Sequence, residues 1–101
     1  MKRYTLRIYL AGQITGDRDY KKKFEKAAAV FIKAGHIVLN PAALPKGLTC
    51  AEYMRICFAM IDVSDVVVFL PDWETSGGAQ LEKTYCDYTR KPYRIMKEEE
   101  M

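Results

Sequence analysis

The feature that most constrains the fold is a short run, V-V-V-F-L at residues 66–70, that is apolar at every position. Successive side chains of a strand point to opposite faces of its sheet, so a strand without polar alternation has both faces buried. Parallel sheets have this property because helices cover both of their faces. The run therefore predicts a central strand of a parallel sheet in an α/β protein.

The N-terminal half predicts two further strands on either side of one helix. Residues 4–11 (Y-T-L-R-I-Y-L-A) are rich in aromatic and aliphatic side chains and end at Gly12, as a first strand would. We expect Asp17 to cap the following helix and Gly35 to end it. An apolar stripe with helical spacing lies between them: Tyr20, Phe24, Ala27, Ala28 and Phe31. Residues 36–39 (H-I-V-L) predict a second strand.

The C-terminal half repeats this alternation. Residues 41–48 contain two prolines and a glycine, which predicts an irregular loop. Thr49 and Glu52 match the T-x-x-E capping box at the start of a second helix. The apolar positions of that helix keep helical spacing: Tyr53, Ile56, Cys57, Met60 and Ile61. A third helix, a fourth strand and a frayed tail are predicted at residues 79–90, 92–96 and 97–101.

Strands that alternate with helices predict a small doubly wound (flavodoxin- or Rossmann-like) parallel sheet of about four strands in three α/β/α layers. A chain of 101 residues supports one core, so we expect a single domain over residues 1–101. In such sheets ligands bind beyond the carboxyl ends of the strands. The two segments at that edge are residues 12–17 and residues 71–82.

Composition excludes several classes of function. The chain is half apolar and 29% charged, with a formal charge of +3, which indicates an ordinary globular protein and not a nucleic-acid binder. Cys50, Cys57 and Cys86 are odd in number and lack C-x-x-C spacing, so we expect neither disulfides nor a metal site. No Walker or G-x-G-x-x-G motif is present, and we expect no cofactor. Without a signal peptide or a long apolar run, we expect a cytoplasmic protein that does not enter a membrane.

Glu82 is the leading candidate for chemistry, because it lies about one turn inside the third helix, next to the strand ends. A carboxylate near a helix N-terminus is stabilised as the anion by the helix dipole. An ionised carboxylate suits attack at C1 of a sugar or stabilisation of an oxocarbenium-like transition state. On local sequence alone we would favour the alternative, a surface glutamate that pairs with Lys83 or Lys91.

The turn before this helix carries further candidates. Ser76, Gly77 and Gly78 could bind phosphate or sugar oxygens through a hydroxyl and free amides, or Ser76 could simply cap the helix. Asp72 could orient a sugar hydroxyl or protonate a leaving base, or be an ordinary turn residue. Trp73 could stack on a nucleobase, as could Tyr9, or fill the core. A structural role is favoured for the only histidine, at position 36.

Four motifs carry a resemblance to a known family: Y-L-A-G-Q-I-T-G at 9–16, N-P-A at 40–42, V-S-D-V-V-V at 63–68 and S-G-G-A-Q-L-E at 76–82. Together they resemble the nucleoside 2-deoxyribosyltransferase superfamily, and in particular a short branch related to 2′-deoxynucleoside 5′-phosphate N-hydrolase. The resemblance implies that Glu82 is the nucleophile at C1 of a (deoxy)ribose and that Tyr9 orients it or contacts the sugar. Ser76 takes the place of a phosphate-contacting serine in the hydrolase and of an aspartate in the transferases. Further contacts to the nucleotide are implied for Gly12, Gln13, Ile14, Thr15, Gly77 and Gly78.

The sequence departs from the active relatives at Cys57, where those enzymes have an aspartate. In them a neighbouring subunit's C-terminal segment enters the site, so the resemblance also implies a homo-oligomer (a dimer or larger). We expect an N-glycosidase or deoxyribosyltransferase acting on nucleosides or nucleotides, with 5′-phosphorylated substrates favoured by Ser76. The alternative that Cys57 favours is a non-catalytic nucleotide-binding module on the same fold. A third is a structural assembly protein in which the glycine turns are incidental.

Overall fold

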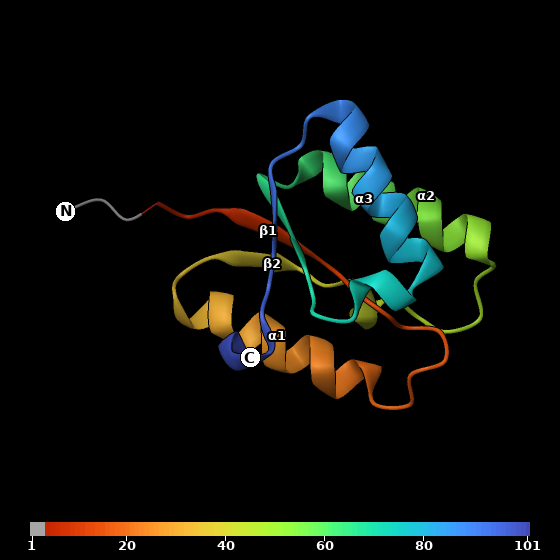
Figure 1. Ribbon diagram of the computed structural model, residues 1–101, viewed down its shortest axis with the longest axis horizontal. Coiled ribbons are helices and arrows are strands. Elements are labelled where there is room, and N and C mark those ends of the chain that lie inside the picture. Colours follow the sequence, from red (N-terminus) through yellow and green to blue (C-terminus); the bar gives the residue numbers. More distant parts are fainter. Residues whose placement is uncertain (1–3) are drawn as a thin grey trace.

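The computed structural model describes residues 4–101 and shows a four-stranded sheet between helices (Figure 1). The elements, in chain order, are β1 (Arg7–Ala11), α1 (Tyr20–Lys33), β2 (Ile37–Leu39), η1 (Pro41–Ala43), α2 (Cys50–Val63), β3 (Val66–Phe69), η2 (Trp73–Thr75), α3 (Gly77–Thr89), β4 (Tyr93–Ile95) and η3 (Glu98–Glu100). Within residues 4–101, no helix combines the length and apolar character that a membrane span requires.

The strands lie in the order β2-β1-β3-β4, and every neighbouring pair is parallel. In the central pair, Tyr9 is aligned with Val67 and Ala11 with Phe69. Helix α1 covers one face of the sheet, and α2 and α3 lie side by side over the other (Figure 1). The predicted doubly wound α/β/α fold is therefore confirmed.

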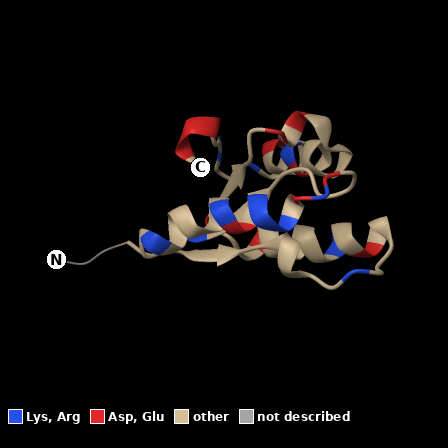
Figure 2. Cartoon of the chain, turned by 90° about the horizontal axis from the view of Figure 1, so that it is seen from below, with Lys and Arg blue, Asp and Glu red and all other residues tan. Residues whose placement is uncertain are grey.

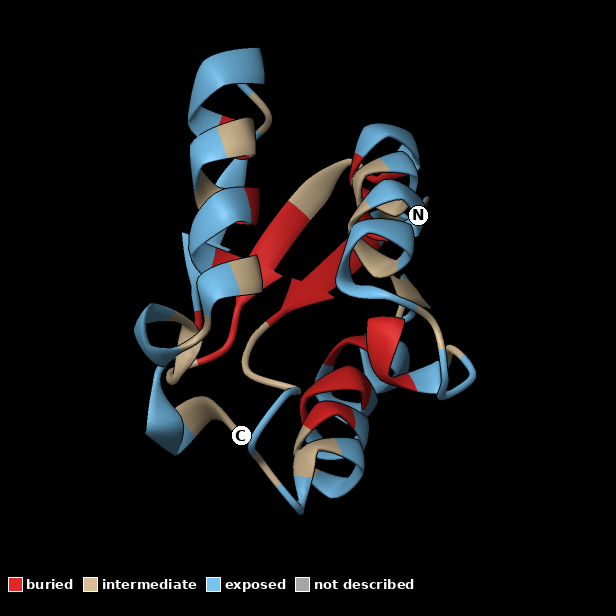
Figure 3. Ribbon diagram, turned by 90° about the vertical axis from the view of Figure 1, so that its right-hand side faces the viewer, coloured by how far each residue is buried: buried red, intermediate tan, exposed pale blue. Residues whose placement is uncertain are grey.

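The central strands are buried on both faces, as the apolar run at 66–70 predicted. Val67, Val68, Phe69 and Leu70 are each at most 1% exposed, and the buried strands lie between exposed helix surfaces in Figure 3. Odd and even positions separate into two clusters: Val68 packs with Phe24 and Phe31 of α1, whereas Phe69 packs with residues of α2 and α3. Side-chain alternation along one strand thus joins the two halves of the core.

The helix boundaries show which local signals acted as expected. The capping box of α2 is present, with the Glu52 amide donating to Thr49 Oγ1 at 3.1 Å and the Thr49 amide to Glu52 Oε1 at 2.8 Å. Gly35 follows α1 with φ +94°, a conformation that favours glycine. The prediction that Asp17 caps α1 was wrong. Asp19 is the N-cap residue, and Asp17 instead accepts a hydrogen bond from the Asp19 amide, at 2.9 Å.

Several predicted boundaries were also wrong in part. The first strand begins at Arg7, where the register with β2 begins, although the Leu6 carbonyl still accepts from the Ile37 amide at 2.9 Å. The loop at 41–48 contains the short turn η1, since Pro41 suits a helical first position and Asn40 accepts from the Ala42 amide. Helix α3 begins two residues early, at Gly77. The predicted frayed tail forms η3, held by an ion pair between Arg94 and Glu100.

Candidate functional site

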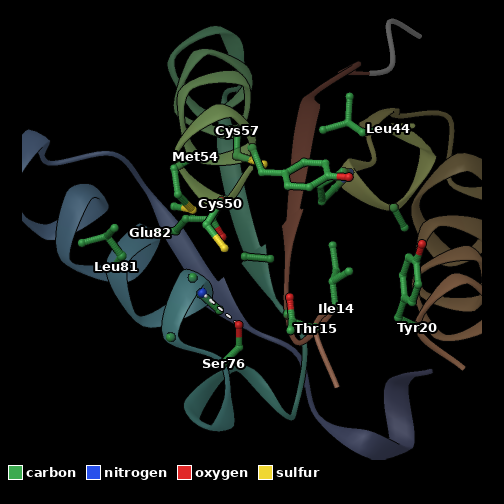
Figure 4. A pocket seen from close by; sticks show the side chains of 18 of the residues that line it. Ile14, Thr15, Tyr20, Leu44, Cys50, Met54, Cys57, Ser76, Leu81 and Glu82 are labelled. Atoms are coloured by element: carbon green, nitrogen blue, oxygen red, sulfur yellow. Dashed lines mark hydrogen bonds between the residues drawn. The ribbon is translucent and has the colours of Figure 1, made fainter. Parts of the chain in front are cut away.

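A cavity of about 610 Å³ opens at the carboxyl ends of β1 and β3. Its walls come from the segments that follow β1, β2 and β3 and from the first turns of α1, α2 and α3. In Figure 4, Glu82, Cys57 and Met54 lie on one side of it, and Ile14, Thr15 and Tyr20 lie on the other. The cavity occupies the edge of the sheet where the sequence predicted a site.

Tyr9 and Glu82 meet at the inner end of this cavity. The Tyr9 hydroxyl donates a hydrogen bond to Glu82 Oε2 at 2.5 Å, and the two residues are 1% and 5% exposed. Tyr9 points toward α3 because alternate residues of β1 face α2 and α3. Glu82 points back at the sheet because it shares the buried face of α3 with Ala79 and Cys86. The alternative of a surface glutamate paired with a lysine is therefore wrong.

Burial changes the acid–base properties expected of Glu82. Desolvation raises the pKa of its carboxyl from 4.5 to about 7, and the hydrogen bond from Tyr9 only partly opposes this. Burial thus opposes the ionised form that the sequence favoured, and near neutral pH the protonated and the ionised carboxyl are both populated. Burial likewise raises the pKa of Tyr9 well above its usual value, so the phenol keeps its proton.

The surroundings of Glu82 are uncharged. The thiols of Cys57 and Cys86 are both buried, and burial raises the pKa of each, that of Cys86 to about 11. Within residues 4–101, none of the residues that line the cavity is a lysine or an arginine. A ligand that reached Glu82 would therefore meet one titratable carboxyl among neutral groups.

The start of α3 forms a second wall of the cavity. The hydroxyl oxygen of Ser76 accepts a hydrogen bond from the Ala79 amide at 3.1 Å, so Ser76 caps the helix. Gly77 and Gly78 line the cavity beside it. A Cβ on Gly77 would meet no atom within 4 Å. The helix start thus offers the cavity a hydroxyl hydrogen and first-turn amides, in addition to its structural cap.

The loop after β1 supplies the opposite wall, although one of its predicted contacts points elsewhere. Gly12, Ile14 and Thr15 line the cavity, and Gln13 does not. The Gln13 amide donates to Asp72 Oδ1 at 3.2 Å, and its side-chain oxygen accepts from Thr75 Oγ1 at 2.7 Å. Gln13 therefore contacts the protein itself and not the cavity.

Asp72 and Trp73 also lie outside the cavity lining. Asp72 forms an ion pair with Lys23 of α1 and lines a second, smaller hollow. Trp73 is half-buried and packs against Phe69 at the edge of the core, with ring centroids 5.5 Å apart, which agrees in part with the alternative that it fills the core. The histidine at position 36 is structural too, because its Nδ1 accepts from the Leu6 amide at 3.1 Å.

Comparison with known proteins places the chain in a family. Residues 6–94 match a family described as a domain of unknown function, DUF4406. The chain belongs to the DUF4406 family. No curated protein and no solved structure matches it.

Several residues that line the cavity of this DUF4406 domain were not among those predicted from its sequence. They are Tyr20, Leu44, Cys50, Tyr53, Met54 and Leu81. Tyr20, Tyr53 and Met54 lie in the first turns of α1 and α2, and those turns start at the same edge of the sheet. Their place could have been inferred from the sequence, since every helix of a parallel α/β fold begins near the carboxyl end of the preceding strand. Among residues 4–101, no three His, Cys, Asp or Glu side chains are grouped to hold a metal ion.

Proposed function

We propose that this DUF4406 domain cleaves the N-glycosidic bond of a nucleoside or nucleotide, by hydrolysis or by deoxyribosyl transfer. The observation that carries the proposal is the buried Glu82 carboxyl, held by the Tyr9 hydroxyl at the inner end of a cavity of about 610 Å³. A buried carboxyl with a raised pKa in a cleft is a common mark of a functional group. The motif resemblance to nucleoside 2-deoxyribosyltransferases supports the choice of reaction.

In the proposed reaction Glu82 acts as the nucleophile. Its ionised oxygen forms a bond to C1′ of the sugar while the C1′–N bond breaks, and the bonding pair leaves with the base, which takes a proton from water. Water, or a second base, then attacks C1′ and releases the Glu82 carboxylate; in hydrolysis the proton of the water passes to solvent. Tyr9 holds the carboxylate in place by its hydrogen bond.

The start of α3 supports a 5′-phosphorylated substrate. The Ser76 hydroxyl and the amides of Gly77 and Gly78 lie in the cavity wall, and helix N-termini bind phosphate through such groups. Ser76→Ala would remove both the hydroxyl and the cap, whereas Ser76→Asp keeps a good cap and adds a negative charge. We expect Ser76→Asp to weaken binding of 5′-monophosphates more than binding of the matching nucleosides, with little change in thermal stability.

A second candidate function is binding without catalysis. Cys57 takes the place of the aspartate found in the active relatives, and burial raises the pKa of its thiol, which makes it a poor proton donor to a leaving base. The cavity, the Tyr9–Glu82 pair and the helix start would all serve a nucleotide-binding module equally well.

Base release separates the two functions. The purified protein is incubated with nucleosides, deoxynucleosides and their 5′-monophosphates, and free base is measured by chromatography. Release that disappears in Glu82→Ala and persists in Glu25→Gln, a substitution at an exposed glutamate of α1, supports the enzyme. Thermal stabilisation by a nucleotide without release supports the binding module. If no compound reacts or binds, both nucleotide functions are refuted.

We also propose that the protein forms a homo-oligomer. Leu81 lines the rim of the cavity and is 50% exposed, an apolar surface that a second subunit could cover. Light scattering during gel filtration gives the mass directly, and a monomer at the concentrations used for activity would contradict this proposal.

A further inference from the structure

Lys23 of α1 connects the two loops that form opposite walls of the cavity. Its Nζ donates to the Gln13 carbonyl at 2.7 Å, to Asp17 Oδ2 at 2.5 Å and to the Asp72 carboxylate. The Lys23 side chain is only 18% exposed, so solvent screens these contacts less than it screens a surface ion pair. Other lysines gather along α1 (Figure 2), but Lys22 and Lys26 are exposed.

Asp72 extends the connection to the start of η2. One carboxylate oxygen contacts Lys23, and the other accepts from the Gln13 amide at 3.2 Å. Thr75 Oγ1 lies 2.7 Å from Gln13 Oε1 and 2.8 Å from the Asp72 carbonyl, so its hydroxyl hydrogen can bind either acceptor. We call Lys23, Gln13, Asp17, Asp72 and Thr75 the clasp.

The loop held by the clasp has little regular structure of its own. No strand or helix includes residues 12–19, where two successive turns are closed by backbone bonds from the Asp17 amide to the Ile14 carbonyl, at 3.2 Å, and from the Tyr20 amide to the Asp17 carbonyl, at 3.4 Å. Gly12 also approaches Asp72 so closely that an added Cβ would lie 3.1 Å from Asp72 Oδ1. The shape of residues 12–15 therefore depends on contacts with α1 and with the segment that follows β3.

Of the clasp residues, only Thr75 lines the cavity; the others lie behind its wall. Lys23, Gln13, Asp17 and Asp72 are absent from the lining, whereas their neighbours Gly12, Ile14 and Thr15 belong to it. We propose that Lys23 and Asp72 are positioning residues that set the shape of this wall relative to the start of α3, and thereby the affinity of the cavity for its ligand. Only the identity of the ligand rests on the proposed function; the control of wall shape does not.

The proposal is tested first without a ligand, through amide hydrogen exchange of Lys23→Met and Asp72→Ala. We expect the Gln13 and Asp17 amides to exchange about tenfold faster or more, because the Gln13 amide donates to Asp72 and the Asp17 amide closes the turn that Lys23 holds. Amides of β1 and β3 should keep their protection. Lys26→Met is the control, since Lys26 is on the same helix, is exposed, and its side chain makes no hydrogen bond or ion pair among residues 4–101.

The thiols of the cavity give a second readout of its shape. Cys57 is 7% exposed and lines the cavity, while Cys50 at the first turn of α2 is exposed. We expect Lys23→Met and Asp72→Ala to change the rate of Cys57 alkylation by iodoacetamide several-fold, and that of Cys50, which lines the same cavity but is already exposed to solvent, much less. Lys23→Arg should restore part of the wild-type rate because it keeps the charge. If one variant does not fold, the milder Asp72→Asn gives the same comparison.

Ligand affinity completes the test, with 2′-deoxyadenosine and its 5′-monophosphate as probes. If either binds, we expect the clasp variants to weaken it about tenfold, with kcat, where turnover occurs, within about twofold of wild type. If neither binds, the proposed function loses support while exchange and alkylation still decide the role of the clasp. Wild-type exchange at the Gln13 and Asp17 amides, or equal acceleration across the whole sheet, would overturn the proposal, because the clasp would then have no local effect or only stabilise the fold.

Discussion

The Tyr9 hydroxyl lies 2.5 Å from Glu82 Oε2, and the two side chains come from elements 73 residues apart in the chain. The pair joins the central strand β1 to helix α3 inside an uncharged part of the core. The phenol favours the carboxylate form of Glu82, whereas burial favours the protonated form more strongly. The ionisation of Glu82 should therefore respond both to the pH and to the loss of the Tyr9 hydroxyl.

The free energy of unfolding should fall as the pH rises from about 4.5 to about 7. The folded protein holds the Glu82 proton up to a pKa of about 7, while the unfolded chain loses it near 4.5. The folded state therefore binds more protons in this window, and stability decreases with pH and levels off above it. At about 1.4 kcal/mol per pKa unit, the full loss is about 3 kcal/mol. Urea denaturation at several pH values measures it.

Glu82→Gln should remove this pH dependence and be more stable than wild type at pH 8, because a neutral amide has no charge to desolvate. Glu25→Gln, at an exposed site on α1, should keep the wild-type slope. Hydrogen bonds to neighbouring groups lower the pKa values of three other carboxyls, those of Asp17, Asp65 and Glu100. These carboxyls affect stability at more acid pH, and equally in wild type and in both variants. Parallel curves for wild type and Glu82→Gln would contradict the prediction.

Tyr9→Phe should raise the pKa of Glu82 above about 7. Among residues 4–101, the substitution removes the one side-chain hydrogen bond that favours the ionised carboxyl, and it leaves the burial of Glu82 largely unchanged. The pKa is read from the chemical shift of the Glu82 side-chain carboxyl carbon. Tyr85→Phe is the matched control, because Tyr85 donates to Asp62 at 2.7 Å and not to Glu82. A lower pKa in Tyr9→Phe would be inconsistent with the hydrogen-bond geometry.

Gly12→Ala and Gly77→Ala should differ sharply in their effect on stability, although both glycines line the cavity. A Cβ on Gly12 would lie 3.0 Å from Leu70 Cβ and 3.3 Å from Phe24 Cζ, so we expect a loss of about 1–3 kcal/mol from overpacking. A Cβ on Gly77 meets nothing within 4 Å at the start of α3, so its substitution should be neutral or slightly stabilising. Thermal denaturation distinguishes them, and equal losses would contradict this account.

Arg90→Gly should stabilise the protein without affecting the cavity. Arg90 follows α3 with φ 60° and ψ 33°, the left-handed conformation in which most side chains are unfavourable. Glycine at such a helix end relieves a cost of about 1 kcal/mol. Urea denaturation tests the gain, and Arg90→Ala, which keeps a Cβ, should show none of it. Unchanged stability in Arg90→Gly would mean that the conformation carries no strain.

The sequence by itself determined the architecture of this protein. The apolar run at 66–70 required burial on both faces, and strands alternating with helices then specified a parallel three-layer fold. The capping box at Thr49 and the end of α1 at Gly35 could also be predicted, because they depend on residues within one turn of each other. The predicted cap at Asp17 was missed because the carboxylate of Asp17 binds the Asp19 amide and the Lys23 side chain instead.

Only the tertiary structure decided the state of Glu82 and the place of Asp72. Local sequence favoured a surface role for Glu82, because no pattern within α3 reveals that Tyr9 and two buried thiols surround it. Asp72 lies in the segment after β3, where a catalytic residue would be expected. Its carboxylate forms an ion pair with Lys23 and does not line the cavity. The spacing of apolar residues predicts which face of its own helix or strand a residue lies on. Desolvation and ion pairing depend on what other elements bring to it, and those partners are set by packing across the whole sheet.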